Sequence, residues 1–262
     1  MSNLHVTQFD RWLHELEERH FAALRFAEVT RALRALSSAY VERRGALTAR
    51  GTFDGAGKRA AYALFYAPLH FLTVSAIIRQ LPGATGGLRH LVDLGCGTGA
   101  AGAAWAAACS PSPRVIGLDV HPWALTEAAL TYKAFGLDGS VRRGDVAAAR
   151  VPAADGIVAG WVMNEVNEHV RNAVLSRLLQ LASRGVRVLV VEPIATRISP
   201  WWREWADAFT SAGGRADEWR FEVVLPDLLK RLDRAAGLRH DELTARSLWI
   251  GGGAKAPPLH FA

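Results

Sequence analysis

The chain has 262 residues, half of them hydrophobic, and a formal net charge of +6, a size that allows one large α/β domain with an extension or two small domains. No uninterrupted apolar run approaches the ~18 residues that a membrane span needs, and the polar segment 1–12 lacks the pattern of a signal peptide. Cys96 and Cys109 have neither metal-ligand nor disulfide spacing, so we expect a protein of the reducing cytoplasm with no metal site and no membrane contact.

The positive charge leaves two interpretations open. A basic chain favours acidic partners such as RNA or DNA. However, only four residues are lysine and the arginines are spread along the chain, as a GC-rich coding sequence would also produce. The densest basic group surrounds a glycine-rich linker over residues 45–57, and it could bind phosphate or form a solvated surface. This group comprises Arg43, Arg44, Arg50, Lys58 and Arg59.

The N-terminal part of the chain is predicted to be helical. Apolar residues recur at spacings of three to five over residues 4–44, which indicates two helices with a break near residues 20–22. After the linker, a further helix is expected to follow Pro68 as far as about residue 81. We therefore expect a helical region over residues 1–81 that recognises substrate or acts as a lid, and a catalytic domain over residues 82–262. Four aromatic residues before this last helix could be core or part of such a lid: Tyr62, Phe65, Tyr66 and Phe71.

The rest of the chain alternates between strand and helix patterns. This alternation predicts an α/β fold with a parallel, doubly wound sheet and helices on both faces. In such a sheet ligands bind at the carboxyl ends of the strands, so the residues that follow each strand are the candidates for a site. Strand patterns cover residues 91–94, 114–119, 140–143, 155–162, 186–192, 221–225 and 243–250. Helical patterns cover residues 100–108, 122–135, 166–183, 201–212 and 226–236.

The first of these strands leads into an alanine-rich helix through three glycines, Gly95, Gly97 and Gly99. Glycine lets the backbone turn sharply and approach a ligand, and the N–H groups at the start of the next helix attract an anionic group. The spacing of Gly97, Gly99 and Gly102 also matches the dinucleotide fingerprint. The arrangement predicts a nucleotide-type site, with a tight strand-to-helix turn that binds no ligand as the alternative.

The sequence Asp-Leu-Gly-Cys-Gly-Thr-Gly over residues 93–99 resembles motif I of the class I S-adenosylmethionine (SAM)-dependent methyltransferases. The resemblance implies a Rossmann-like fold, with a mainly parallel seven-stranded sheet that ends in a pair with an antiparallel edge strand. It implies SAM as the cofactor and a methyl acceptor as the second substrate. It also implies that Asp93 contacts the amino group of SAM, and that Gly95, Cys96, Gly97 and Gly99 wrap its methionine part.

Acidic residues follow the next two strands. Asp119 lies about 20 residues beyond the glycines, where a carboxylate can accept hydrogen bonds from both ribose hydroxyls, and Val120 would pack on the adenine face. The resemblance implies that Asp145 contacts the adenine amino group, with Val146 supplying a neighbouring backbone contact. A turn aspartate beside Gly144 is the alternative for Asp145.

The end of the fourth strand carries the candidates for catalysis. Trp161 would border the cofactor, Asn164 and Glu165 are the polar groups nearest the expected mouth of the site, and His169 lies beyond them. Methyl transfer mainly requires alignment of the acceptor, and a base is needed only if the acceptor loses a proton. Asn164 could instead cap a helix, and Glu165 could be a first-turn acid. The segment lacks the Asn/Asp-Pro-Pro-Tyr signature of many amino-group methyltransferases, which argues against methylation of a base nitrogen.

Two further features follow the fifth strand. Glu192-Pro193 either faces substrate or only ends the strand. The four tryptophans beyond it could stack a flat substrate or pack within the fold. They are Trp201, Trp202, Trp205 and Trp219.

A narrower resemblance rests on the helical N-terminal region, the aromatic segment 62–71, the Met163-Asn164-Glu165 turn and Glu192-Pro193. Together they are similar to the Rsm22-type proteins, which implies ribosomal RNA or the small ribosomal subunit as acceptor or partner. No cysteine follows Cys109, so the iron–sulfur site of many such proteins is not implied. A small-molecule acceptor, or a SAM-binding assembly factor without efficient turnover, are alternatives. A nicotinamide-dependent oxidoreductase is less favoured because no Tyr-x-x-x-Lys follows the fourth strand.

Overall fold

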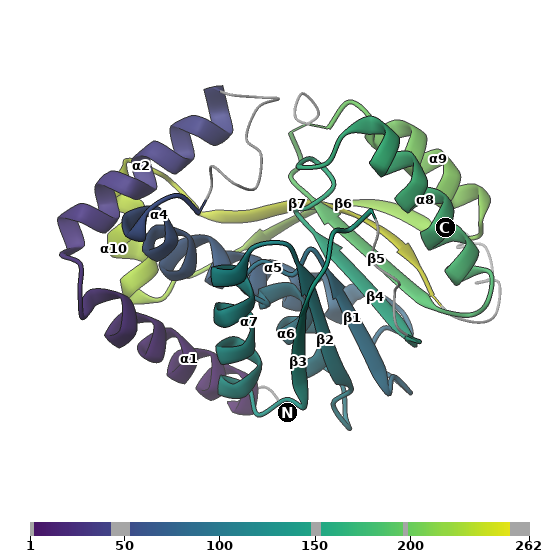
Figure 1. The fold of residues 1–262 in the computed structure, drawn as a ribbon, viewed down its shortest axis with the longest axis horizontal. Helices are drawn as coiled ribbons and strands as arrows, with labels where there is room; N and C mark the ends of the chain where they lie inside the picture. Colours follow the sequence, from purple (N-terminus) through teal and green to yellow (C-terminus); the bar gives the residue numbers. More distant parts are fainter. Residues whose placement is uncertain (1–2, 43–52, 148–152, 196–198, 252–262) are drawn as a thin grey trace.

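The computed structural model describes residues 3–42, 53–147, 153–195 and 199–251. A helical N-terminal part precedes a regular alternation of strands and helices (Figure 1). The strands are β1 (His90–Leu94), β2 (Arg114–Asp119), β3 (Gly139–Arg143), β4 (Gly156–Gly160), β5 (Arg187–Glu192), β6 (Arg215–Glu222) and β7 (Glu242–Ile250). The helices are α1 (Asn3–Phe21), α2 (Phe26–Glu42), α4 (Ala56–Ala61), the π-helical turn η1 (Tyr62–Tyr66), α5 (Ala67–Gln80), α6 (Ala100–Ala107), α7 (Pro122–Ala134), α8 (Glu168–Ala182), α9 (Trp202–Ser211) and α10 (Asp227–Ala236).

The strands form one seven-stranded sheet in the order β3-β2-β1-β4-β5-β7-β6. The pairs from β3 through β5 are all parallel, whereas β7 is antiparallel to both of its neighbours, β5 and β6. The mainly parallel, doubly wound sheet is therefore confirmed. The antiparallel strand lies one place inside the edge of the sheet, not at the edge itself.

Helices cover both faces of this sheet (Figure 1). α5, α6 and α7 pack on one face, where Trp105 and Tyr132 are fully buried. α8 and α9 pack on the other face around Leu178 and Trp205. Because the central parallel strands are buried on both sides, they are continuous apolar runs, and this is why their positions could be predicted from the sequence.

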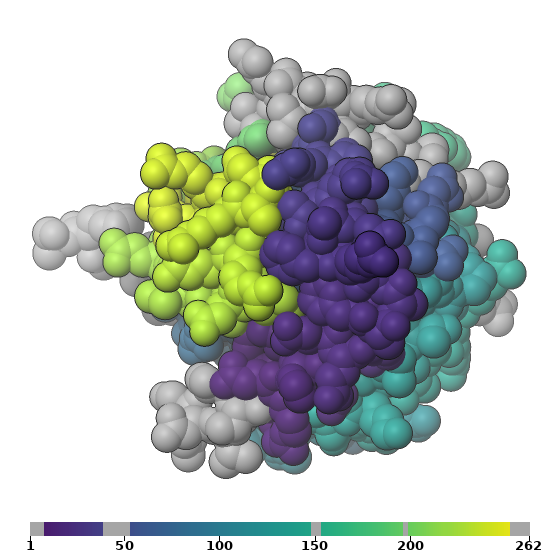
Figure 2. Space-filling view, turned by 90° about the vertical axis from the view of Figure 1, so that its left-hand side faces the viewer, coloured from purple at the N-terminus to yellow at the C-terminus, as the bar shows by residue number. Residues whose placement is uncertain are grey.

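The N-terminal helices α1 and α2 share the hydrophobic core of the α5–α7 face. Buried Trp12 of α1 packs against Phe71 of α5, with their ring centroids 5.7 Å apart. α2 lies beside α10, where the Arg34 guanidinium donates a hydrogen bond to the carbonyl of Ala235, and Figure 2 shows these segments side by side on one face. The two predicted helices are confirmed, and a division of the chain near residue 81 stays a prediction.

Residues 56–80 form one continuous helical run, so the helix predicted to follow Pro68 begins earlier, at Ala56. Pro68 lies in the first turn of α5, directly after η1, and a π-helical turn of this kind is frequent at functional sites. By length and a mean hydropathy of 1.6, this run is the one candidate for a membrane span within the described ranges. Its most apolar window is 72% buried inside the protein, as in a core helix.

Two strands differ from their predicted bounds. The apolar run 221–225 predicts the sixth strand, but β6 spans Arg215–Glu222. Half-buried and exposed side chains alternate along β6, and the exposed ones are mostly charged, so this edge strand has no continuous apolar signal. The fourth strand ends at Gly160, short of the predicted residue 162, because Trp161 leaves the extended conformation with a φ of 55°.

Candidate functional site

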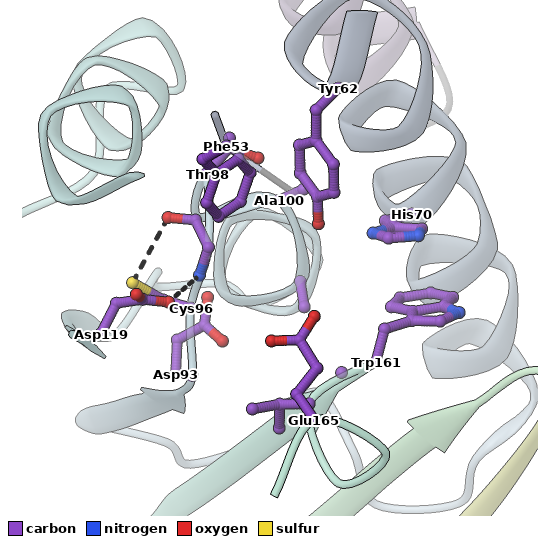
Figure 3. A pocket seen from close by; sticks show the side chains of 15 residues that line it. Phe53, Tyr62, His70, Asp93, Cys96, Thr98, Ala100, Asp119, Trp161 and Glu165 are labelled. Atoms are coloured by element: carbon purple, nitrogen blue, oxygen red, sulfur yellow. Dashed lines mark hydrogen bonds between the residues drawn. The ribbon is translucent and has the colours of Figure 1, made fainter. Parts of the chain in front are cut away.

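A recess lies at the carboxyl ends of β1, β2 and β4 (Figure 3). It contains about 520 Å³ of space between protein atoms, part of which is open to solvent. Three segments that are distant in sequence supply most of its lining. These are the region of the three glycines, the turn after β4, and aromatic residues of the N-terminal part.

The glycine loop, residues 95–99, depends on glycine for its shape. Gly95, Gly97 and Gly99 have φ values of 69°, 51° and 80°, which favour glycine over other residues. A Cβ at Gly95 would lie only 2.3 Å from Cγ2 of Val162. The loop therefore packs directly against the turn that follows β4.

One buried carboxylate oxygen next to this loop has no partner among the residues that the structure describes. Asp93 is 1% exposed, and its Oδ2 accepts hydrogen bonds from the Gly102 N–H at 2.9 Å and the Tyr132 hydroxyl at 3.2 Å. Within the described ranges its buried Oδ1 has no hydrogen-bond partner, and Asp93 lines the recess. Burial raises the pKa of Asp93 to about 7, although the two hydrogen bonds oppose this shift. An unpaired buried acceptor is costly until a donor reaches it, so Asp93 is suited to hold a cationic group.

Asp119, at the end of β2, also lines the recess. Its Oδ2 accepts a hydrogen bond from the Gly97 N–H and its Oδ1 from the His121 N–H, each at 2.8 Å. The first of these bonds holds the glycine loop. A carboxylate has about four acceptor sites, so Asp119 retains capacity for the ribose hydroxyls that the sequence assigned to it.

The other residues predicted to hold the adenosine part do not line the recess. Val120 is 42% exposed next to Asp119. The Oδ1 atom of Asp145 accepts a hydrogen bond from the Ala147 N–H at 2.9 Å, which is the local turn foreseen as the alternative. The Val146 side chain is buried in the core of the α8–α9 face. The adenine contacts of these three residues stay predictions.

Cys96 lines the recess, and its thiol is buried beneath the glycine loop. Burial, together with the carboxylates of Asp93 and Asp119, holds the pKa of this thiol well above its usual value. The thiol is therefore protonated at neutral pH and contributes packing instead of a reactive thiolate.

The Glu165 turn, residues 161–167, follows β4 and presents Trp161 and Glu165 to the recess. Trp161 has a positive φ of 55°, which is unusual for a bulky residue. Its N–H donates to the carbonyl of Val191 at 2.8 Å. Its ring stacks on His70, with centroids 3.7 Å apart and only 4° between the planes. Such a conformation persists where the surroundings fix it, and it is frequent at active sites.

Two side chains hold the Glu165 turn in place, those of buried Glu192 and half-buried Arg171. Glu192, at the end of β5, accepts hydrogen bonds from the Met163 N–H at 2.9 Å and from Nδ2 of Asn164 at 2.7 Å. Arg171 of α8 donates to the carbonyls of Met163 and Val166, both at 2.8 Å. Burial raises the pKa of Glu192 to about 8. The position of Glu165 is therefore determined from both sides of the turn.

Asn164 is part of this support and does not line the recess. Besides its bond to Glu192, its Oδ1 accepts a hydrogen bond from Nε1 of Trp201 at 2.9 Å. The residue that caps α8 is Asn167, whose Oδ1 accepts from the Val170 N–H at 3.0 Å, so the alternative of Asn164 as helix cap is wrong. A catalytic contact by Asn164 stays a prediction.

Glu165 directs its carboxyl group into the recess (Figure 3). By surface area the residue is exposed, yet burial of the carboxyl by flanking protein atoms, with a contribution from Asp119, raises its pKa to about 7. A carboxyl group with such a pKa can accept or release a proton near neutral pH. His169 lies apart, in a shallow hollow at the start of α8.

An aromatic wall formed by Phe53, Tyr62, His70 and Trp161 faces these carboxylates. Sequence reasoning considered Tyr62 as core or lid and missed Phe53 and His70. The four-residue spacing of Tyr62, Tyr66 and His70 along one helical run was the available signal, because residues at this spacing share a helix face. Burial lowers the pKa of His70 to about 3, so its ring is neutral.

The basic group singled out in the sequence cannot be assembled from the described residues, because Arg43, Arg44 and Arg50 lie outside them. Arg59 has a structural role: its Nε donates to the carbonyl of Phe53 at 2.8 Å, and its guanidinium lies 5.8 Å from the ring centre of Trp123. A phosphate-binding patch on this side of the molecule stays a prediction.

The tryptophans after β5 pack within the fold. Trp205 and Trp201 are buried in the core beneath α9. The Arg246 guanidinium lies 4.3 Å from the ring centre of Trp202, and Nε1 of Trp219 donates to the Ser247 hydroxyl at 2.8 Å. The packing alternative is confirmed for these residues.

Comparison with known proteins identifies the class. Residues 91–187 match the family described as methyltransferase domain. No curated protein sequence matches the chain.

The structure is similar to mitomycin 7-O-methyltransferase MmcR, with a TM-score of 0.54 and 16% identity over 86% of this chain and 66% of that one. It is also similar to the O-methyltransferase NcsB1 from neocarzinostatin biosynthesis, solved with SAM and 2-hydroxy-5-methyl naphthoic acid, with a TM-score of 0.54 and 16% identity over 90% and 73% of the two chains. An O-methyltransferase family protein from Burkholderia thailandensis has a TM-score of 0.54 and 14% identity, over 78% of this chain and 62% of that one.

The chain thus spans about two thirds of the length of these proteins. Residues 91–187 are therefore matched as a methyltransferase domain, and the fold is that of SAM-dependent methyltransferases. Together they indicate a SAM-dependent methyltransferase and support SAM as its cofactor. The residues present fit that cofactor. Asp93 offers an unpaired acceptor to the ammonium group of SAM, Asp119 can accept hydrogen bonds from its ribose, and the glycine loop leaves space between them.

Proposed function

We propose that this methyltransferase acts on a small molecule bound in the recess, and that Glu165 accepts the proton which the acceptor loses. One observation carries the proposal. The carboxyl group of Glu165 and the aromatic wall share a single recess with the glycine loop (Figure 3). A concave site that combines aromatic side chains with a few convergent polar groups is typical of small-molecule binding.

SAM supplies an already activated methyl group, so the protein mainly has to align the acceptor and remove its proton. The contact between Gly95 and Val162 places the Glu165 turn against the loop that would hold the methionine part of SAM. Glu192 and Arg171 fix the turn, so Glu165 is held ready before any ligand binds. Such preorganisation of a base is worth about 10²–10⁴-fold in rate.

An RNA acceptor receives less support from the same residues. Nucleic-acid binding depends on Lys and Arg side chains that neutralise phosphates. Within the described part of the chain, no lysine or arginine lines the recess. Arg59, one of the two described members of the basic group, is engaged with Phe53 and Trp123.

The test is a transfer assay with methyl-labelled SAM. The purified protein is offered a library of small hydroxyl and amine compounds in one arm, and ribosomal RNA and small ribosomal subunits in the other. We expect label in a small-molecule product and none in RNA, with transfer slowed by about 10²–10⁴-fold in Glu165→Gln. Label only in RNA would overturn the proposal, and SAM binding without transfer in either arm would favour a non-catalytic assembly factor.

A further inference from the structure

We propose that the acceptor is an amine with a flat, apolar body, whose ammonium group is bound by Glu165 while its body lies against the aromatic wall. This inference rests on the proposed function, because it names the class of acceptor for the same recess. It follows from the charge of the lining, from the unpaired state of Glu165 and from the shape of the wall.

The lining carries negative charge and little to offset it. Asp93, Asp119 and Glu165 each contribute a carboxyl group. No arginine or lysine accompanies them among the lining residues that the structure describes. His70, which could have carried a positive charge, is neutral because its burial lowers its pKa to about 3. A concave site with one sign of charge attracts the opposite sign, so it favours a cation and disfavours a carboxylate or phosphate.

The three carboxyl groups differ in what they already contact. Asp119 is engaged with the glycine loop and Asp93 with Gly102 and Tyr132, and both are assigned to the cofactor. Glu165, in contrast, makes no side-chain hydrogen bond or ion pair to any residue that the structure describes. Its carboxyl group points into the recess while its backbone is held by the surrounding turn (Figure 3). A held carboxylate without a partner is suited to a cationic donor that arrives with the ligand.

The aromatic wall is suited to bind the flat, apolar body of the acceptor. The rings of Trp161 and His70 are stacked in parallel, 3.7 Å apart, and both border the recess. The Tyr62 ring lies 6.0 Å from His70 at a steep angle, with its hydroxyl directed into the recess opposite Glu165 (Figure 3). Aromatic surfaces bind flat apolar groups by stacking and attract ammonium groups through cation–π interaction.

The chemistry of such an acceptor balances without a further reactant. The ammonium group gives one proton to the Glu165 carboxylate, which frees the nitrogen lone pair. That lone pair forms the new nitrogen–carbon bond to the methyl group, and the carbon–sulfur bond breaks with its electron pair remaining on sulfur. The products are the N-methylated ammonium, S-adenosylhomocysteine and protonated Glu165, which returns its proton to water. The chain lacks the Asn/Asp-Pro-Pro-Tyr signature of many amino-group methyltransferases. An aliphatic amine is consistent with this absence, because its nitrogen lone pair is not conjugated with a ring.

The experiment compares three probes that share one ring: 2-phenylethylamine, 2-phenylethanol and phenylacetate. Each is titrated by calorimetry into protein saturated with S-adenosylhomocysteine, so the readout is binding and not turnover. We expect the amine to bind about tenfold more tightly than the alcohol, which corresponds to about 1.4 kcal/mol, and phenylacetate to be the weakest. The isosteric variant Glu165→Gln should lose the preference for the amine, and Glu168→Gln, three residues away, should retain it.

Equal binding of the amine and the alcohol, stronger binding of phenylacetate, or no binding of any of the three would overturn the amine proposal. In each case the proposed methyltransferase function would stand, because the protein had bound S-adenosylhomocysteine. Failure to bind S-adenosylhomocysteine in the first step would instead remove both proposals. An unchanged affinity of Glu165→Gln for S-adenosylhomocysteine shows that this variant is folded.

Discussion

The glycine loop and the Glu165 turn follow neighbouring parallel strands, and each lies next to a buried carboxyl group whose pKa is raised by burial. The two carboxyl groups differ in one respect. Glu192 uses both of its oxygens to hold the Glu165 turn, whereas Oδ1 of Asp93 has no hydrogen-bond partner among the described residues. We therefore propose that Glu192 is a structural support and that Asp93 is a binding group. On this proposal, one part of the recess binds the cofactor and the other positions a base.

The largest expected effect is on kcat, and it distinguishes the function of the Glu165 turn from that of the glycine loop. Glu165→Gln should lower kcat by about 10²–10⁴-fold, because it removes the proton acceptor, while the affinity for SAM stays unchanged. Glu168→Gln, on the exposed start of α8, is the matched control. Steady-state kinetics and calorimetry on both variants make the measurement. A parallel loss of SAM affinity would show that Glu165 belongs to the cofactor half of the recess.

The pH dependence of kcat sharpens the same assignment. The pKa of Glu165 is raised to about 7, and only the ionised form accepts a proton, so activity should rise with pH up to about that value. The other titratable groups that line the recess are Asp93, Cys96, Asp119, Tyr62 and neutral His70. The positive charge of bound SAM favours the ionised carboxylate and moves the midpoint downward. A rise that persists in Glu165→Gln would assign the titration to another group.

Gly95→Ala tests the contact between the two loops. The new Cβ would lie 2.3 Å from Val162 on a backbone with positive φ, so we expect the free energy of unfolding to fall by about 2–4 kcal/mol. Gly136→Ala is the control, because it has a φ of 64° with nothing within 4 Å of its Cβ position, and it should cost about 1–2 kcal/mol. Urea unfolding compares the two. Equal losses would mean that the loops are not packed together.

Glu192→Gln tests the structural carboxylate. The substitution leaves one acceptor oxygen where two are used, so we expect a loss of about 1–3 kcal/mol in stability and a lower kcat with unchanged SAM affinity. A shifted midpoint in the pH profile of kcat would show that the turn carrying Glu165 has moved. Glu222→Gln, an exposed acid on β6, should change none of these quantities. Normal kcat in Glu192→Gln would limit Glu192 to a role in stability alone.

A smaller effect concerns stability and pH. The pKa of Glu192 is about 8 in the folded protein and 4.5 ordinarily, so the folded state holds more protons than the unfolded state between these values. Its contribution to stability is therefore present at low pH and is lost as pH rises toward about 8. The difference in unfolding free energy between the native chain and Glu192→Gln should change along this range. A constant difference in urea titrations from pH 4.5 to 8 would contradict the raised pKa.

The cofactor half of the site could be predicted from sequence because its signals are local. Asp93 and the three glycines lie within one strand-to-helix connection, and each has a backbone or electrostatic reason for its identity. The same holds for the central strands, where burial on both faces leaves a continuous apolar run. The edge strand β6 lacked that signal, and its bounds were predicted wrongly.

The acceptor half could be predicted only in part. Glu165 was named from its position after a strand. The helical spacing places His70 on the same face as Tyr62, but its stacking on Trp161 depends on how the helix packs in the fold. The positive φ of Trp161 and the bonds of Glu192 to the turn likewise depend on tertiary structure. Asn164 was predicted to be catalytic because it is a polar residue near the mouth of the site. In the structure its amide group instead forms hydrogen bonds to Glu192 and Trp201.

The most direct test of the central claim is a calorimetric titration of the native chain and of Asp93→Asn with SAM and with methylthioadenosine, which lacks the amino-acid part of SAM. If Oδ1 of Asp93 receives the ammonium group, the substitution should weaken SAM binding by about 1.5–3 kcal/mol, or roughly 10–150-fold. Methylthioadenosine should bind both proteins equally, which also shows that the variant is folded. Equal affinity of both proteins for SAM, or an equal loss for both ligands, would contradict the assignment of the unpaired carboxylate to the cofactor.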